Sequence, residues 1–257
     1  MRMLRMTAKS VAVAFSMFSA VPMPQLAWDK DSMRLMLIAF PLVGLLIGLF
    51  AWGCSQMSAA LGLSSLVRAL VLTALPLLVT GGIHLDGFCD TWDALASHRE
   101  PKDMRRILKD PHIGAFGTMH LALLLLATFV LWTELPSVPP ACLILPYALS
   151  RSLSGFSVAA FPLAPHDGLA RSFAEASDRT IVRWGCALIA TATSAVLAFT
   201  GGWSMIIAAA LTFAWYRFVV VRQFGGLSGD LCGWYVQTSE LWMLASIYIV
   251  RCLEAIL

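Results

Sequence analysis

The chain has 257 residues, of which 59% are hydrophobic and 13% charged, and its formal net charge is +3. Soluble domains carry roughly 25% charged residues, and disordered chains combine low hydrophobicity with high charge. The composition therefore excludes both classes and predicts an integral membrane protein, with no sign of nucleic-acid binding. The six cysteines show no CxxC spacing, which argues against a disulfide framework or a zinc site.

The first 27 residues contain basic side chains, then the apolar run VAVAFSMFSA, and then Pro22 and Pro24. The apolar run is short for a membrane span, and the prolines end it. We interpret this stretch as an amphipathic helix that lies at the cytoplasmic interface. A cleaved secretory signal is the alternative interpretation.

Apolar runs of about 20 residues, the length that crosses roughly 30 Å of hydrocarbon, occur repeatedly in the remainder. They predict an all-α, polytopic membrane protein with about seven transmembrane helices, in a single domain over residues 1–257. The fifth and sixth spans are divided at Gly201-Gly202, because glycine pairs mark tight turns. The predicted spans cover residues 35–54, 66–82, 114–133, 140–160, 184–200, 203–221 and 238–256.

The positive charges are distributed unevenly among the segments that connect these spans. Fifteen of the 18 Lys and Arg residues lie before the first span, in residues 83–113 and 161–183, or in the last turns of the sixth span and the connection that follows it. All of these segments fall on the same side of the membrane if the spans alternate. Because cytoplasmic loops carry the excess of Lys and Arg, we expect this side to be the cytoplasmic one.

Three aspartates, Asp86, Asp90 and Asp93, are spaced to lie within roughly 60° of arc on one face of a helix. Carboxylates at this spacing repel one another, and near a bilayer they require a partner or a function. Oxygen ligands without supporting cysteines favour Mg²⁺ or Mn²⁺, and Mg²⁺ completes its shell with waters and substrate phosphate. The stripe therefore predicts a metal site for a phosphate or diphosphate. The alternative is a solvated acidic face at a helix start.

The segment that follows this stripe is basic. Arg105, Arg106 and Lys109 are candidates to hold an anionic substrate or to neutralise a leaving phosphate. Alternatively, they anchor the loop to lipid headgroups. Asp110 precedes Pro111 in an extended or turn conformation and is a candidate metal ligand, while His84 is a catalytic candidate through its proximity to the aspartates.

A third cluster, with the sequence GGLSGD, occupies residues 225–230 and leads into the last span. Its glycines permit close approach of the backbone to phosphate, although a turn between two helices is the alternative. Asp230 and Glu240 are candidate metal ligands, and Arg151 in the fourth span is either a phosphate clamp or half of a structural ion pair. The candidate substrate-binding glycines are Gly225, Gly226 and Gly229.

The segments GGIHLDGFCDTWDAL, ILKDPHIGAFG and GGLSGDLCG, followed by Glu240, resemble in order and separation the motifs of the cobalamin synthase family. These proteins are also called adenosylcobinamide-GDP ribazoletransferases. The resemblance extends loosely over the chain, including FSAVPMP near residue 18, PLVGLLIG at 41–48 and DGLARSF at 167–173. It departs from the family pattern at Ala94, Pro111 and Ala20.

The resemblance implies a single phosphotransferase domain in a bacterial cytoplasmic (inner) membrane, with Mg²⁺ as cofactor. A hydroxyl of α-ribazole, or of its 5′-phosphate, would attack the cobinamide-bearing phosphorus of adenosylcobinamide-GDP and expel GMP, which forms adenosylcobalamin or its 5′-phosphate. We expect Asp86 and Asp90 to bind the metal, and Asp93 either to bind it or to deprotonate the ribose hydroxyl, with His84 and Lys109 as further catalytic candidates. The expected metal ligands are Asp86, Asp90, Asp93, Asp110, Asp230 and Glu240.

The size of the corrinoid leads us to expect a wide cavity facing the cytoplasm, with Trp92, Trp234 or Tyr235 as apolar walls. Two other functions remain as alternatives. A phosphotransferase of the CDP-alcohol type also uses spaced aspartates, although its usual motif is not met after Ala94. A secondary transporter would place acids at the centres of its spans, whereas here they gather near one face. Whether the chain forms a homo-oligomer is left open.

Overall fold

The computed structural model describes residues 2–24, 29–164 and 169–256, and it is almost entirely helical. The only pairing of extended chain in this part is an isolated bridge between Leu163 and Leu227. The all-α prediction is confirmed. The helices are α1 (Arg2–Phe18), α2 (Lys30–Met33), α3 (Met36–Ala60), α4 (Ser65–Thr80), α5 (Ile83–Ala96), α6 (Pro101–Ile107), α7 (Ala115–Glu134), α8 (Pro140–Ala160), α9 (Leu169–Ala176), α10 (Arg179–Phe199), α11 (Trp203–Phe218), the π-helical turn η1 (Val219–Gln223) and α12 (Gly229–Ile256).

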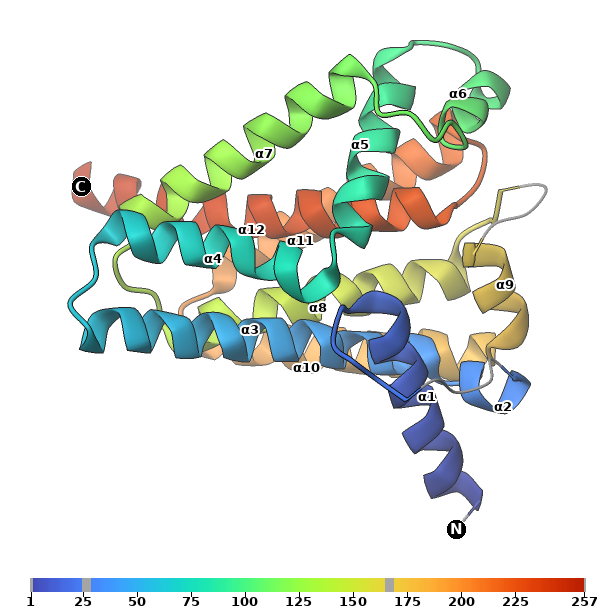
Figure 1. Cartoon of the computed structure of the whole chain (residues 1–257), viewed down its shortest axis with the longest axis horizontal. Helices are drawn as coiled ribbons and strands as arrows, with labels where there is room; N and C mark the ends of the chain where they lie inside the picture. The colour runs from blue at the N-terminus through green and yellow to red at the C-terminus, as the bar shows by residue number, and fades with distance from the viewer. Residues whose placement is uncertain (1, 25–28, 165–168, 257) are drawn as a thin grey trace.

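The long helices α3, α8, α10, α11 and α12 run along the long axis of the molecule, and α7 crosses them obliquely (Figure 1). Within the described residues, five helices are long and apolar enough to cross a membrane: α3, α7, α8, α10, and α11 with η1. The bent pair α4 and α5 raises the number to six. The chain is therefore a multi-pass membrane protein.

The predicted number of about seven spans is higher than the five or six that length and apolarity support. The difference is α12, which has 28 residues and runs beside α11 and α8 but contains Gln237, Glu240 and Arg251. These polar side chains lower its mean hydropathy. The helix also begins at Gly229, nine residues before the predicted start at 238, because its first turns are buried against protein rather than exposed to lipid.

The chain breaks sharply between α4 and α5, whose axes differ by 95°. Gly81 and Gly82 occupy the break with φ angles of +64° and +82°, which side chains with a Cβ atom rarely adopt. The predicted span 66–82 therefore ends as α4 partway along the bundle (Figure 1). The following residues, expected to start a cytoplasmic connection, form α5, which packs between α7 and α12.

The centre of the bundle is built on a close contact between α3 and α8. A Cβ atom on Gly44 would lie 2.1 Å from the carbonyl oxygen of Tyr147, and one on Gly48 would lie 2.3 Å from that of Ile144. Two glycines four residues apart form the small-residue face that lets helices in a bilayer approach backbone to backbone. This contact fixes α8 against α3, and the other helices pack around the pair.

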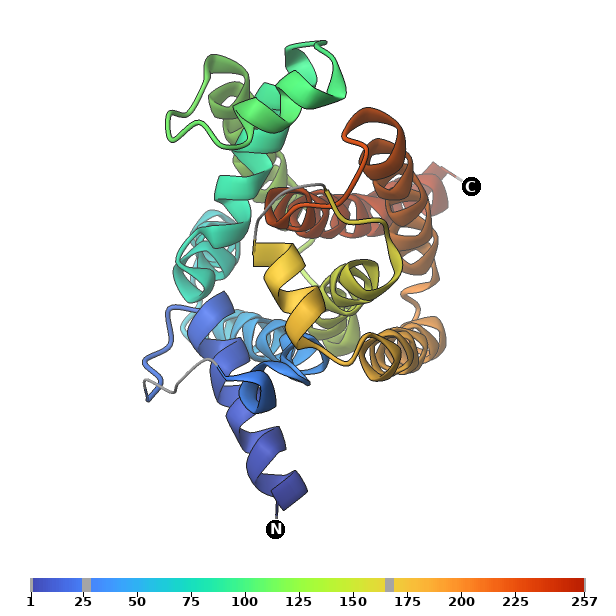
Figure 2. The ribbon, with the colours of Figure 1, turned by 90° about the vertical axis from the view of Figure 1, so that its right-hand side faces the viewer.

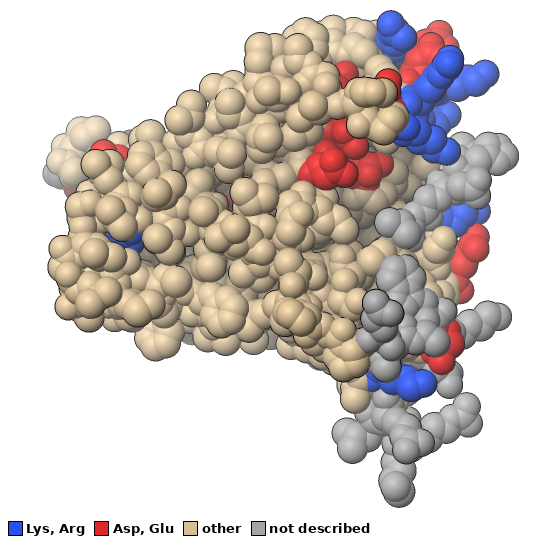
Figure 3. All heavy atoms as spheres, viewed as in Figure 1, with Lys and Arg blue, Asp and Glu red and all other residues tan. Residues whose placement is uncertain are grey.

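The two ends of the bundle differ in charge (Figure 3). The basic residues on and after α6 gather at one end, where α9 lies across the bundle near its centre (Figure 2). At the opposite end, Arg68 is buried and donates hydrogen bonds to the carbonyl oxygens of Trp132 and Leu135 over 2.8 and 2.7 Å. The predicted segregation of exposed basic residues is therefore present, while the identity of the charged end as cytoplasmic remains a prediction.

The amino-terminal stretch forms a helix, α1, as expected for the amphipathic interpretation. It crosses the charged end of the bundle and packs against α3 and α2, with Val13, Ala14 and Phe18 buried. Its location at a membrane interface remains a prediction.

Candidate active site

The aspartate helix α5 is held in place by α12. A Cβ atom on Gly87 would lie 2.7 Å from both the Cα atom and the carbonyl oxygen of Asp230, and one on Gly233 would lie 3.0 Å from the carbonyl oxygen of His84. Both glycines therefore allow the two backbones to touch. This contact brings the first and third sequence clusters together, although more than 130 residues separate them along the chain.

One cavity of about 630 Å³ is lined by three of the predicted metal ligands, Asp86, Asp90 and Asp110, and we call it the aspartate cavity. Asp86 is exposed and Asp90 half-buried, and neither has a salt-bridge partner within the described residues. The charges of Asp93 and Asp230 also act on Asp90, so the region carries a concentrated negative potential. Figure 3 shows acidic side chains gathered near the basic end of the molecule. The remaining lining residues are Leu77, Gly81, Gly82, Ile83, Leu85, Cys89, Pro111 and Ile113.

Asp110 belongs to the connection between α6 and α7, which folds back over the aspartate helix. Its Oδ1 atom accepts hydrogen bonds from the backbone N–H of His112 at 3.0 Å and from the His112 ring at 2.9 Å. These hydrogen bonds hold the pKa of Asp110 below its ordinary value. The carboxylate therefore stays ionised at neutral pH, as an oxygen ligand for a cation must be.

Asp93 has a different position from the other two residues of the predicted stripe. Its carboxylate accepts hydrogen bonds from the backbone N–H groups of Gly114, at 2.8 Å, and Gly117, at 2.9 Å. A Cβ atom on either glycine would overlap this carboxylate. Asp93 therefore caps the start of α7 and does not line the aspartate cavity. The predicted roles as metal ligand or base find no support in this placement.

The basic segment is connected to the third cluster through one side chain. The Nη1 atom of Arg105 donates a hydrogen bond to the carbonyl oxygen of Phe224, beside Gly225. Arg106 and Lys109 are exposed and form no salt bridge within the described part of the chain. None of these three basic residues lines the aspartate cavity. Arg105 ties α6 to the third cluster, Arg106 lies on the same helix, and Lys109 lies in the connection that follows it.

The glycines of the third cluster shape a turn, one of the two roles considered from the sequence. Gly225 has a φ angle of +66°, and a Cβ atom on Gly226 would lie 2.5 Å from the backbone nitrogen of Ala164. The turn is fixed by a hydrogen bond from the Leu227 N–H to the carbonyl oxygen of Pro162 at 2.8 Å. Gly229 has open space around it and lines a second cavity.

Asp230 and His84 line this second cavity, which adjoins the aspartate cavity. Asp86 and Ile83 line both cavities, so the two share a wall. The structure thus brings Asp230 close to the aspartate helix, as predicted, but into the neighbouring cavity. His84 is buried, with 5% of its surface exposed.

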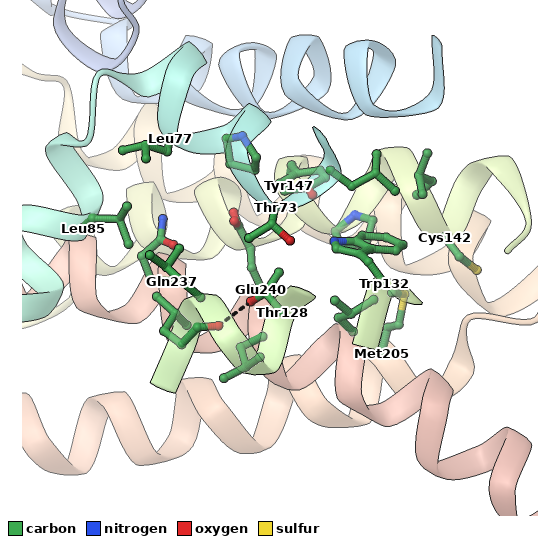
Figure 4. A pocket seen from close by; sticks show the side chains of 18 residues that line it. Thr73, Leu77, Leu85, Thr128, Trp132, Cys142, Tyr147, Met205, Gln237 and Glu240 are labelled. Atoms are coloured by element: carbon green, nitrogen blue, oxygen red, sulfur yellow. Dashed lines mark hydrogen bonds between the residues drawn. The ribbon is translucent and has the colours of Figure 1, made fainter. Parts of the chain in front are cut away.

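Arg151 and Glu240 pair with each other inside the bundle. The Nη1 atom of Arg151 lies 2.6 Å from Oε1 of Glu240, and the Ser150 hydroxyl donates to the same oxygen at 2.8 Å. Glu240 lines a third, small cavity of about 60 Å³ together with Thr73 and Gln237 (Figure 4). The structure does not bring either member of the pair to the aspartates. Of the two roles considered for Arg151, the ion pair is the one observed.

Two of the aromatic residues expected as walls of a wide cavity, Trp234 and Tyr235, are buried inside the bundle, so the prediction is wrong for them. Trp234 and Tyr235 are 0% and 1% exposed and pack against Tyr216, while the Trp92 ring stacks on His120 at 3.9 Å. None of the three lines a described cavity. Trp234 and Tyr235 lie on the face of α12 that packs against α11, and burial of these large side chains stabilises that contact.

The second cavity is also lined by Phe18, Phe40 and Phe173, which were not predicted from the sequence as site residues. Phe18 and Phe173 lie within the segments FSAVPMP and DGLARSF, so the motifs themselves held a signal. Phe40 carries no such signal, since it looks like any apolar residue of a span.

Comparison with known proteins gives a consistent result over most of the chain. Residues 10–248 match the protein family described as cobalamin-5-phosphate synthase. Similar proteins named adenosylcobinamide-GDP ribazoletransferase occur in Lachnoclostridium phytofermentans (33% identity, 90% of each chain) and Desulfitobacterium hafniense (36% identity, 90% of this chain and 93% of the relative). Another, from Geobacillus kaustophilus, is 31% identical over 91% of this chain and 95% of the relative. No solved structure shows a significant match.

The match covers all three aspartate-bearing clusters and the helices that position them. The chain therefore belongs to the cobalamin-5-phosphate synthase family and is a membrane-embedded transferase of cobalamin biosynthesis.

Proposed function

We propose that this chain joins adenosylcobinamide-GDP to α-ribazole, or to α-ribazole 5′-phosphate, and releases GMP. The observation that carries the proposal is the convergence of Asp86, Asp90 and Asp110 on one cavity. These carboxylates come from two separate segments of the chain, and α12 holds their helix in place. Carboxylate oxygens can hold a divalent cation that in turn binds a diphosphate donor, and the relatives are named for this donor and a ribazole acceptor.

The donor set fits Mg²⁺, although no three His, Cys, Asp or Glu side chains in the described chain are close enough together to hold a metal on their own. Mg²⁺ is usually bound by one or two carboxylates and takes its remaining ligands from water and substrate phosphate. Asp86 and Asp90, one turn apart and without salt bridges, would hold it, and Asp110 lines the same cavity. When bound, the cation would neutralise charge on the diphosphate oxygens.

In the reaction, a hydroxyl oxygen of the acceptor ribose forms a bond to the cobinamide-bearing phosphorus. The bond between this phosphorus and the bridging oxygen breaks, and GMP departs with that oxygen. The hydroxyl proton passes to a carboxylate of the aspartate cavity. Asp93 positions this machinery by fixing the start of α7, from which the connection that carries Asp110 extends.

The proposed setting is a bacterial inner membrane with the aspartate cavity facing the cytoplasm. The exposed basic residues at the same end of the bundle support this orientation, because Lys and Arg are retained on the cytoplasmic side. The donor and the 5′-phosphate form of the acceptor carry anionic groups, and Arg106 and Lys109 would attract them electrostatically.

The experiment uses purified full-length protein in liposomes with adenosylcobinamide-GDP, α-ribazole 5′-phosphate and Mg²⁺. GMP release should require the acceptor and Mg²⁺, and Asp86→Asn and Asp90→Asn should each abolish most of it. Asp103→Asn is the matched control, because Asp103 is an exposed acid on α6 outside the cavity. An intact wild-type protein that releases no GMP would overturn the proposal, and CDP-alcohol donors would be screened next.

A further inference from the structure

The second cavity has no assigned ligand in the reaction described above. It has a volume of about 170 Å³ and lies among α1, α3, α5, α8, α9 and α12. Its lining is mainly apolar and contains neither Lys nor Arg, so it is not a phosphate site. The residues used below are Phe18, Phe40, His84, Asp86 and Phe173, and we call this space the phenylalanine cavity.

Four aromatic rings in its wall come from four separate helices. The Phe18 ring centroid lies 4.2 Å from that of Phe40 and 6.0 Å from that of Phe173, which it meets edge to face at 76°. The His84 ring lies 5.6 Å from Phe40 at 61°. A planar aromatic ligand gains most in such a setting, because it can stack on one ring and contact the edges of others.

His84 also supplies a polar atom to this apolar wall. Its side chain is 5% exposed, and its Nε2 atom has no hydrogen-bond partner within the described chain. A buried polar atom left without a partner costs free energy, which a ligand atom can recover by bonding to it. An imidazole N–H would donate to an unsubstituted nitrogen of a heteroaromatic ring.

The phenylalanine cavity adjoins the proposed reaction centre, because Ile83 and Asp86 line both it and the aspartate cavity and form a shared wall. A nucleoside seated across this shared wall would place its base among the phenylalanines and its ribose beside the carboxylates. α-Ribazole has this form, since its base is an apolar benzimidazole with one unsubstituted ring nitrogen.

We propose that the phenylalanine cavity binds the aromatic base of the ribazole acceptor, with His84 Nε2 hydrogen-bonded to the free ring nitrogen. This proposal rests on the function proposed above and names the acceptor subsite within it. The ring contacts orient the acceptor so that its ribose hydroxyl faces the aspartate cavity. His84 and the three phenylalanines are acceptor-binding residues and take no part in binding the donor diphosphate.

The test measures binding of α-ribazole to full-length protein in nanodiscs, without donor or Mg²⁺. Phe18→Leu and Phe173→Leu should each raise the Kd for α-ribazole roughly 3- to 10-fold, since one aromatic contact is lost. The matched control is Phe156→Leu, because Phe156 is a half-buried residue of α8 that contacts Phe213 outside the cavity. Phe156→Leu should bind α-ribazole with the same Kd as the wild type. In a separate activity assay, the KM for adenosylcobinamide-GDP should be unchanged in all three variants.

A second comparison isolates the His84 hydrogen bond. The indole analogue of α-ribazole lacks the free ring nitrogen, so it should bind wild-type protein roughly 2- to 10-fold more weakly than α-ribazole. His84→Leu should remove this difference between the two ligands, whereas a purely structural role would leave it intact.

The outcomes distinguish the two proposals. If wild-type protein releases GMP but the Kd for α-ribazole is the same in wild type, Phe18→Leu and Phe173→Leu, the base lies elsewhere and this inference is overturned alone. If wild-type protein neither binds α-ribazole nor releases GMP, the proposed function is overturned together with it.

Discussion

The acids of the aspartate cavity and the acid inside the bundle differ in how their charge is balanced. Glu240 lies beside Arg151, with Oε1 and Nη1 2.6 Å apart, and Ser150 adds a hydrogen bond. Asp86 and Asp90 have no basic partner within the described residues and face a cavity. The charge of Glu240 is therefore neutralised within the fold, whereas the charges of Asp86 and Asp90 are left available to a cation or a ligand.

The largest expected effect concerns the ion pair inside the bundle. Arg151→Met leaves the Glu240 carboxylate buried without its counterion, which should lower the free energy of unfolding by about 3–5 kcal/mol. The double variant Arg151→Met/Glu240→Leu should recover most of this loss, because it buries no charge at all. Reversible unfolding in mixed micelles measures both. Equal losses in the single and double variants would contradict the view that the pair mainly neutralises itself.

The next prediction concerns the acids of the aspartate cavity, whose substitution should lower activity without lowering stability. Asp86→Asn or Asp90→Asn should lower the rate of GMP release by roughly 10²–10³-fold, the size found when one electrostatic contact to a transition state is removed. The same substitutions relieve repulsion and should leave the free energy of unfolding unchanged or a few tenths of a kcal/mol higher. Thermal unfolding of the two variants checks the second part, and a marked loss of stability would place these residues in the same class as Glu240.

A smaller effect is expected at Asp93, which we expect to stabilise the fold as Glu240 does. Asp93→Ala removes two hydrogen bonds from the start of α7 and should cost roughly 1.5–3 kcal/mol of stability. Asp93→Asn keeps one acceptor and should retain more stability and more GMP release than Asp93→Ala. A general base would behave otherwise, since both substitutions would then lower the rate by a similar factor of roughly 10²–10⁴.

The smallest effect concerns an exposed acid at the start of α10. The carboxylate of Asp178 accepts from the Ile181 N–H at 3.2 Å and pairs with Arg34 at 3.1 Å, which lowers its pKa below 3.8. A lowered pKa stabilises the fold above the unfolded-state pKa, and this contribution is lost as the pH falls through the folded-state value. Asp178→Asn should therefore lower Tm slightly at pH 7, and this difference should vanish in acid. A difference in Tm that persists at low pH would assign the effect to something other than charge.

Much of the fold followed from the sequence because membrane spans are set by simple constraints. The fourth predicted span coincides with α8, which begins at a proline and is mostly apolar. The predicted division at Gly201-Gly202 is present as a turn. The start of α12 was misplaced because polar residues that pack against protein read as a loop when hydropathy is the only guide. The right angle between α4 and α5 depends on what each half packs against, which no local pattern records.

The candidate site was predictable in its residue types and less so in their grouping. The helical spacing of Asp86 and Asp90 was sufficient to place both on one face, and Asp110 was a candidate through its position before Pro111. The same spacing could not show that the Asp93 carboxylate accepts hydrogen bonds from the backbone N–H groups at the start of α7. Nor could it pair Arg151 with Glu240, because that pairing depends on the tertiary arrangement of α8 and α12.

The backbone contact between Gly87 and Asp230 determines when, during synthesis of the chain, the candidate site can assemble. Chains fold from the amino terminus as they leave the ribosome, at roughly 5–20 residues per second. The aspartate helix therefore enters the membrane before the helix it packs against has been synthesised. Until residues beyond 229 emerge, the aspartate helix lacks the contact that fixes it, so the candidate site forms late in biogenesis and a ribosome that stalls earlier leaves it unassembled.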